Sequence, residues 1–208
     1  MPLLQHATFV TSATAAPHLP VDSELEVAVA GRSNAGKSSA INALAGRRRL
    51  AFVSKTPGRT QEINYFRIVD GKYLVDLPGY GYAKVPAQIK KRWEAFLGEF
   101  LLLRPQLAGL IVIMDARHPV TELDLRLLDW FSPTGKPVHV LLTKSDKLTR
   151  QESAKTLAQV RRFLNDSYPG YTAQLFSSVS RSGVATAEEV IASWLQLTTN
   201  KKPPVKGE

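Results

Sequence analysis

The chain of 208 residues contains no cysteine. It can therefore form no disulfide, no thiolate metal site and no cysteine nucleophile, and we expect a cytoplasmic protein. Long hydrophobic runs are also missing: the longest, Leu107 to Met114, includes Gly109 and is far shorter than the roughly 20 residues that span a bilayer. The N-terminus lacks a basic stretch followed by an apolar one, so we expect no signal peptide and no association with a membrane.

Acidic side chains are scarce relative to basic ones. Lysine and arginine number 27 against 18 aspartates and glutamates, which gives a net charge of +9. A field of this sign attracts polyanions, and RNA is the first candidate partner. The alternative is that the charge only keeps the surface soluble.

Strand-like and helix-like segments alternate along most of the chain. The expected strands are residues 25–30, 63–69, 73–77, 110–114, 138–142 and 173–176, and the expected helices are residues 37–45, 87–103, 122–130, 152–164 and 187–195. This alternation predicts an α/β fold whose mostly parallel, six-stranded sheet carries helices on both faces. Asp70-Gly71 between two of these strands predicts a hairpin, hence one antiparallel edge strand. We expect an N-terminal extension (1–22), one domain (23–198) and a disordered basic tail (199–208).

The octapeptide Gly31-Arg32-Ser33-Asn34-Ala35-Gly36-Lys37-Ser38 has the G-x-x-x-x-G-K-S pattern of a phosphate-binding loop between a strand and a helix. Glycines let successive N–H groups point at phosphate oxygens, and the following helix adds its positive end. Lys37 is expected to reach the β- and γ-phosphates, and the Ser38 hydroxyl to bind Mg²⁺ directly.

Asp76-Leu77-Pro78-Gly79 follows an apolar strand. A carboxylate there can hold Mg²⁺ through a water molecule, and Gly79 lets its N–H approach the γ-phosphate. Without the phosphate-binding loop before it, the same tetrapeptide would be read as an ordinary turn.

Two further loops are suited to the base of a nucleotide. Thr143-Lys144-Ser145-Asp146 supplies a carboxylate that can accept two N–H groups from guanine but none from adenine, and the stem of Lys144 can lie along the base. Phe176-Ser177-Ser178 can offer backbone N–H groups to the guanine oxygen. Each alone could instead be a helix cap or a turn.

In order and spacing these motifs resemble the translation-factor-like GTPases, and more closely the EngB family. The resemblance rests on Gly31 to Ser38, Thr56-Pro57-Gly58-Arg59-Thr60-Gln61, Asp76-Leu77-Pro78-Gly79-Tyr80-Gly81-Tyr82-Ala83, Asp115-Ala116-Arg117-His118-Pro119 and Thr143 to Asp146. It implies a bacterial GTPase that acts in assembly of the large ribosomal subunit and is needed for cell division and septum formation. Gly58, Arg59, Thr60, Gln61 and Glu62 would contact GTP, with Thr60 binding Mg²⁺ directly.

Hydrolysis in such a protein would depend on Lys37, Thr60, Gly79 and Asn34. Many GTPases place a glutamine after the aspartate–glycine motif to orient water; here the residue is Tyr80, so we expect slow intrinsic turnover. Relatives with asparagine at the fourth loop position use it to bind K⁺, and Asn34 is the candidate ligand here. Arg59 could supply charge instead.

Two other functions stay open. A P-loop kinase or ATPase would share Gly31 to Ser38 but has no need of Thr143 to Asp146. A nucleotide-gated module that binds RNA or protein with negligible turnover would suit Tyr80. We expect a monomer that binds GTP and GDP.

Overall fold

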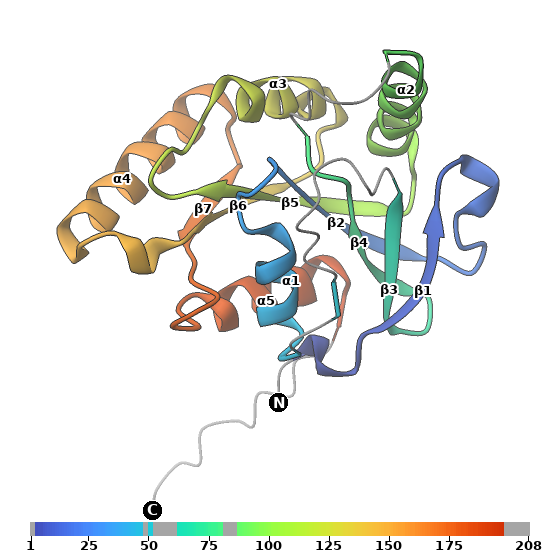
Figure 1. Ribbon diagram of the computed structural model, residues 1–208, viewed down its shortest axis with the longest axis horizontal. Helices are drawn as coiled ribbons and strands as arrows, with labels where there is room; N and C mark the ends of the chain where they lie inside the picture. Colours follow the sequence, from blue (N-terminus) through green and yellow to red (C-terminus); the bar gives the residue numbers. More distant parts are fainter. Residues whose placement is uncertain (1–2, 48–49, 52–61, 81–86, 198–208) are drawn as a thin grey trace, which may run out of the picture.

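The computed structural model describes residues 3–47, 50–51, 62–80 and 87–197, with only the backbone for residues 87–94. They form one mixed sheet of seven strands in the order β1-β3-β4-β2-β5-β6-β7 (Figure 1). The strands are β1 (Thr8–Ala13), β2 (Leu25–Gly31), β3 (Ile63–Val69), β4 (Lys72–Asp76), β5 (Leu107–Asp115), β6 (Val138–Thr143) and β7 (Thr172–Leu175).

Helices cover both faces of this sheet (Figure 1). They are α1 (Lys37–Leu44), α2 (Ala87–Leu103), α3 (Glu122–Phe131), α4 (Arg150–Ser167) and α5 (Val184–Trp194), with the short 3₁₀ turns η1 (Leu3–His6), η2 (Ala16–His18), η3 (Ser132–Thr134) and η4 (Ser145–Lys147). Reciprocal caps start α3 at Thr121 and α4 at Thr149. Within the described ranges, no helix has the length and apolarity needed to cross a bilayer.

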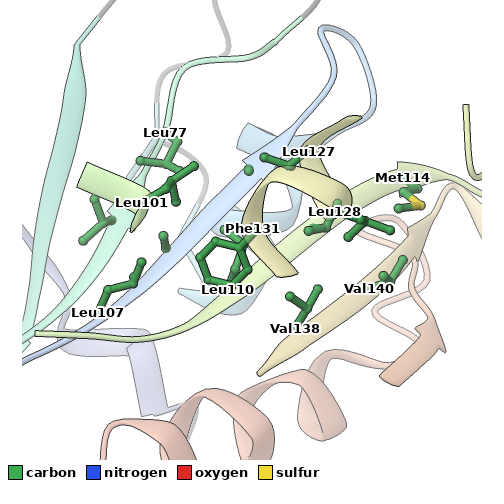
Figure 2. Packing of buried hydrophobic residues seen from close by; sticks show 14 of the residues in the cluster. Leu77, Leu101, Leu107, Leu110, Met114, Leu127, Leu128, Phe131, Val138 and Val140 are labelled. Carbon is green, nitrogen blue, oxygen red and sulfur yellow. The ribbon is translucent and has the colours of Figure 1, made fainter. Parts of the chain in front are cut away.

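Strand periodicity divides the core into two clusters. In β5, Val112 and Met114 pack toward α2, α3 and α4, whereas Ile111 and Ile113 pack toward α1 and α5. Figure 2 shows the α3 side chains Leu127, Leu128 and Phe131 lying over β5 and β6. Near-continuous burial of the central strands is what a sheet covered on both faces requires.

The fold class is confirmed, but the number of strands was wrong. The hairpin of β3 and β4 is antiparallel as predicted, and β1 adds a seventh strand outside it by pairing with β3. This strand lies in the segment treated as an N-terminal extension. Its outer side chains are exposed, Phe9 by 55 %, so the sequence carries no buried apolar run to mark it. The predicted tail, residues 199–208, lies outside the described residues.

The parallel pairing of β2 with β4 and β5, and of β6 with β5 and β7, brings their carboxyl ends to one edge. The loops that follow β2, β4, β6 and β7 carry the four predicted motifs. Ligands of open α/β sheets bind at this edge, so the topology gathers the candidate site there.

Candidate nucleotide-binding site

The loop between β2 and α1 has the backbone of a phosphate cradle. Gly36 precedes the first turn of α1 with φ 101°, and Asn34 also has a positive φ, 63°. At the start of the loop a Cβ on Gly31 would lie only 2.9 Å from the Ile113 Cβ, so a larger residue would push the loop off β5. Glycine is therefore required at the start of the loop by packing and at its end by conformation.

The Lys37 ammonium forms a hydrogen-bonded ion pair with Asp76, at the end of β4. Asp76 is only 7 % exposed, so its carboxylate needs a positive partner, and Lys37 supplies one. The lysine predicted to bind phosphate and the carboxylate predicted to hold a metal-bound water are therefore in direct contact. Gly79 lies close to the phosphate loop, because a Cβ on it would be 3.4 Å from the Ser33 nitrogen.

The loop after β6 is attached to the phosphate loop. The Thr143 hydroxyl donates to the Ala35 carbonyl, and its oxygen lies 3.0 Å from the Met114 carbonyl oxygen. The Lys144 ammonium donates to the Asn34 carbonyl at 2.7 Å. The loop predicted to read the base and the loop predicted to hold phosphate are therefore one connected unit.

The loop after β7 closes on the loop after β6. The Ser177 hydroxyl donates to the Asp146 carboxylate at 2.6 Å, and this hydrogen bond lowers the pKa of Asp146 below its usual value. Ser145 donates to the Phe176 carbonyl through both its N–H and its hydroxyl, at 3.2 and 2.9 Å. The lowered pKa keeps Asp146 ionised, as a guanine acceptor must be.

One detail of the base-binding prediction needs correction. The Phe176 N–H already donates to the Leu142 carbonyl, and the Ser177 N–H to the Ser182 carbonyl. Since neither can also serve a ligand, Ser178 is left as the donor among these three. The Phe176 side chain is fully buried in the core, as is that of Leu77, so neither side chain is available to a ligand.

Sequence reasoning missed the support beneath Lys144. Asp115, at the end of β5, lies 2.9 Å from the Lys144 ammonium and binds the Arg117 guanidinium at 2.9 and 2.7 Å. Burial opposes ionisation of Asp115, but these hydrogen bonds outweigh it and hold its pKa well below the usual range. The signal was available, because Asp115 ends an apolar strand as Asp76 does.

The structure brings together the predicted residues after β2, β4, β6 and β7. Gly58, Arg59, Thr60 and Gln61 lie outside the described residues, and Glu62 stands just before β3. No cluster of three or more histidine, aspartate or glutamate side chains suited to a metal ion occurs in the part of the chain that the structure describes.

Comparison with known proteins agrees with this geometry. A family model described as a 50S ribosome-binding GTPase matches residues 26–144. Over its full length the chain is 59 % identical to the probable GTP-binding protein EngB of Dechloromonas aromatica (strain RCB), covering 97 % of that protein. Identity to the corresponding protein of Neisseria meningitidis serogroup B is 52 %, over 94 % of each chain.

Among solved structures, the crystal structure of a probable GTP-binding protein engB matches with a TM-score of 0.62 at 20 % identity, covering 82 % of this chain and 98 % of that one. The G domain of the T. maritima FeoB iron transporter matches with a TM-score of 0.54 at 28 % identity, with the same coverage. At 20 % identity, the match to the engB crystal structure is evidence for the fold alone.

The fold and the arrangement of its loops place the chain in the class of P-loop GTPases. Within that class, full-length identity of this size decides the family. The chain belongs to the EngB family of GTP-binding proteins.

Proposed function

We propose that this protein is a GTP-hydrolysing switch of the cytoplasm that acts in assembly of the large ribosomal subunit. A defect in that assembly would also disturb cell division and septum formation. The proposal rests on one observation: Thr143 and Lys144, which precede Asp146 in the same loop, donate hydrogen bonds to the phosphate loop. The matched family description and the charge of +9 support a ribosomal partner rich in RNA.

Mg²⁺ fits the residues at the phosphate end. Hydroxyl and carboxylate oxygens are its preferred ligands; Ser38 stands in the first turn of α1, and Asp76 is a buried carboxylate beside Lys37. Ser38 and Thr60 would bind the ion directly and Asp76 through water. When bound, the ion neutralises charge on the phosphate oxygens.

Lys37 has two uses in this scheme. It forms an ion pair with Asp76 in this structure; with nucleotide bound it would turn to the β- and γ-phosphates and leave the carboxylate free to hold a metal-bound water. The Gly79 N–H would donate to the γ-phosphate. Tyr80 offers no amide to orient water, which supports slow turnover without a ribosomal partner.

Asp146→Asn tests the guanine site. An amide cannot accept both guanine N–H groups, so GTP and GDP affinity should fall at least about 100-fold while weak ATP binding is unchanged. Titration with the three nucleotides measures this, and Asp166→Asn, an exposed carboxylate on α4, is the matched control. Tighter binding of ATP than GDP by the unmodified chain would instead favour a kinase or ATPase.

A nucleotide-gated binding module is the second candidate, because the Tyr80 hydroxyl is engaged with Asp124 rather than with the phosphate loop. Measuring GTP hydrolysis with and without large-subunit particles separates the two. A rate that the particles raise supports the enzyme; a negligible rate in both conditions supports the module.

A further inference from the structure

The loop between β7 and α5 is closed by its own hydrogen bonds. The Ser177 hydroxyl accepts the N–H groups of Val179 and Ser180 at 3.2 and 3.1 Å. The Ser177 N–H donates to the Ser182 carbonyl at 3.0 Å. Among the described residues, the Ser178 N–H has no acceptor. This turn therefore presents the Ser178 N–H, the group proposed to donate to the guanine oxygen.

Arg181 connects this loop to α1. Its Nη2 donates to the Ala43 carbonyl at 3.1 Å, in the last turn of the helix. Within the described residues, no other side chain from Ser178 to Ser182 forms a hydrogen bond outside the loop. The tip of the loop is exposed, with Val179 at 80 %. Arg181 is therefore well placed to fix the tip relative to α1.

The Ala43 carbonyl is a favourable acceptor for a cation. The last four carbonyls of a helix lack partners within the helix, and the helix dipole places negative partial charge at that end. Ala43 also accepts the Gly46 N–H at 3.2 Å, and the second lone pair of its oxygen remains for the guanidinium.

Arg181 has a backbone conformation that arginine rarely adopts. Its φ is 60°, in the left-handed region that favours glycine. Glycine would suit this backbone better, but it could not donate to Ala43. The contact with α1 is therefore what the arginine side chain contributes at this position.

The other end of α1 lies at the phosphate side of the site. Lys37 and Ser38 stand in its first turn, and its eight residues span about 12 Å at about 1.5 Å per residue. A helix this short is a rigid connection between its two ends. Holding the loop at Ala43 therefore sets the Ser178 N–H at a fixed distance from the residues that would bind phosphate.

We propose that Arg181 is a positioning residue for guanine recognition. Through α1 it holds the Ser178 N–H where the 6-oxo oxygen of guanine lies when the phosphates occupy their loop. Asp146, which would accept the N1–H and the 2-amino group of the same base, is held separately by the Ser177 hydroxyl. The inference rests on the proposed function, because it concerns how the same site recognises GTP and GDP.

Arg181→Asn tests this role. Asparagine tolerates a positive φ but is too short to reach Ala43, and the position is exposed, so the variant should fold. The probes are GDP, 6-thio-GDP and IDP. In 6-thio-GDP a poor acceptor, sulfur, replaces the 6-oxo oxygen, so the affinity ratio of GDP to 6-thio-GDP reports the Ser178 hydrogen bond. IDP lacks only the 2-amino group, so the ratio of GDP to IDP reports Asp146.

For Arg181→Asn, GDP affinity should fall about 3- to 10-fold, the contribution of one hydrogen bond, while 6-thio-GDP affinity changes little. The ratio of GDP to 6-thio-GDP should therefore drop toward one, and the ratio of GDP to IDP should stay that of the unmodified chain. Titration of each Mg²⁺-loaded chain measures both ratios. Arg161→Gln is the matched control, since Arg161 also donates to a backbone carbonyl, that of Ala173 at 3.0 Å. It should change neither ratio.

An equal loss of affinity for all three nucleotides would overturn the positioning role, because Arg181 would then only support the fold. An unchanged ratio of GDP to 6-thio-GDP would also overturn it. Equal binding of these two nucleotides by the unmodified chain would do the same, since Ser178 would then not recognise the 6-oxo group. Failure of the unmodified chain to bind any guanine nucleotide would instead overturn the proposed function.

Discussion

At the scale of single residues, Thr143 connects the loop proposed to bind the base to the loop proposed to bind phosphate. Its hydroxyl holds the Ala35 carbonyl, and its neighbour Lys144 holds the Asn34 carbonyl. Asp115 and Arg117 in turn hold Lys144 in place. An exposed ion pair contributes little, but this set joins three loops through partly buried groups, so misplacement at one end would reach the other.

Asn34 carries the prediction about potassium. It is exposed at the tip of the phosphate loop, and its positive φ of 63° is one that glycine also adopts. If its amide helps to bind K⁺, turnover in KCl should exceed turnover in NaCl by at least about ten-fold, or about 1.4 kcal/mol of barrier.

Asn34→Gly keeps the backbone conformation and removes the amide, so its rates should be equal in the two salts. Steady-state hydrolysis at matched ionic strength, with and without large-subunit particles, measures the difference. Equal rates for the unmodified chain in both salts would contradict the prediction that Asn34 binds K⁺.

At the scale of elements, the pairing of β6 with β7 encloses a histidine. His139 is 4 % exposed. Its Nδ1 lies 2.7 Å from the Thr172 hydroxyl, and its Nε2 lies 2.9 Å from Oε1 of the Gln174 side chain. The Gln174 amide donates to the Gly183 carbonyl at 2.6 Å, so its oxygen faces the ring and Nε2 carries the proton. Burial, aided by the charge of Arg161 and opposed by the Gln174 hydrogen bond, lowers the pKa of His139.

This shift predicts lower stability in acid. Above the ordinary histidine pKa of about 6.5 both states are neutral at this site; below it the unfolded chain binds a proton that the folded chain resists. The loss should grow as the pH falls below that value, and at pH 5.5 it cannot exceed about 1.4 kcal/mol, the limit set by protonation of the unfolded chain alone. His139→Gln should remove that part of the loss between pH 7.5 and 5.5, measured by urea unfolding, whereas His18→Gln at an exposed site should not. An identical pH dependence in all three chains would contradict the assignment.

At the scale of elements, most helices and strands could be predicted from the sequence. The buried strands and amphipathic helices were found with ends close to those observed, because burial on one face or both leaves a clear apolar pattern. β1 leaves none, since it lies at an exposed edge. The contacts of Tyr80 with Asp124 and of Lys37 with Asp76 join distant segments, and only the sheet order brings them together. Motif spacing therefore predicted which loops meet at one edge of the sheet, but not which side chains hold them together.

At the scale of the whole molecule, some of the basic side chains that give the charge of +9 already have partners within the protein. Arg161 and Arg162 on α4 already have partners: the Arg161 Nε donates to the Ala173 carbonyl at 3.0 Å, and Arg162 lies 3.8 Å from Asp166. Lys90, Lys91 and Arg92 stand in the first half of α2, the helix that follows the Asp76-to-Gly79 loop. If the partner is an RNA-rich particle, we expect these three residues of α2 to contribute to its binding.

The final prediction concerns salt. If the partner is a ribosomal particle, affinity of the GTP-analogue-bound chain should fall by at least about 100-fold between 50 and 200 mM KCl, as counterions are released from phosphates. Replacing Lys90, Lys91 and Arg92 by glutamine should make the slope of log affinity against log salt shallower by about 0.7 to 0.9 for each phosphate that the variant no longer neutralises. Arg161→Gln with Arg162→Gln is the control and should change the slope less, because Arg161 donates to the Ala173 carbonyl and the charge of Arg162 lies beside that of Asp166. Co-sedimentation with purified large-subunit particles over a salt series measures all three chains. An affinity that does not respond to salt would mean that the basic excess serves only the solubility of the surface.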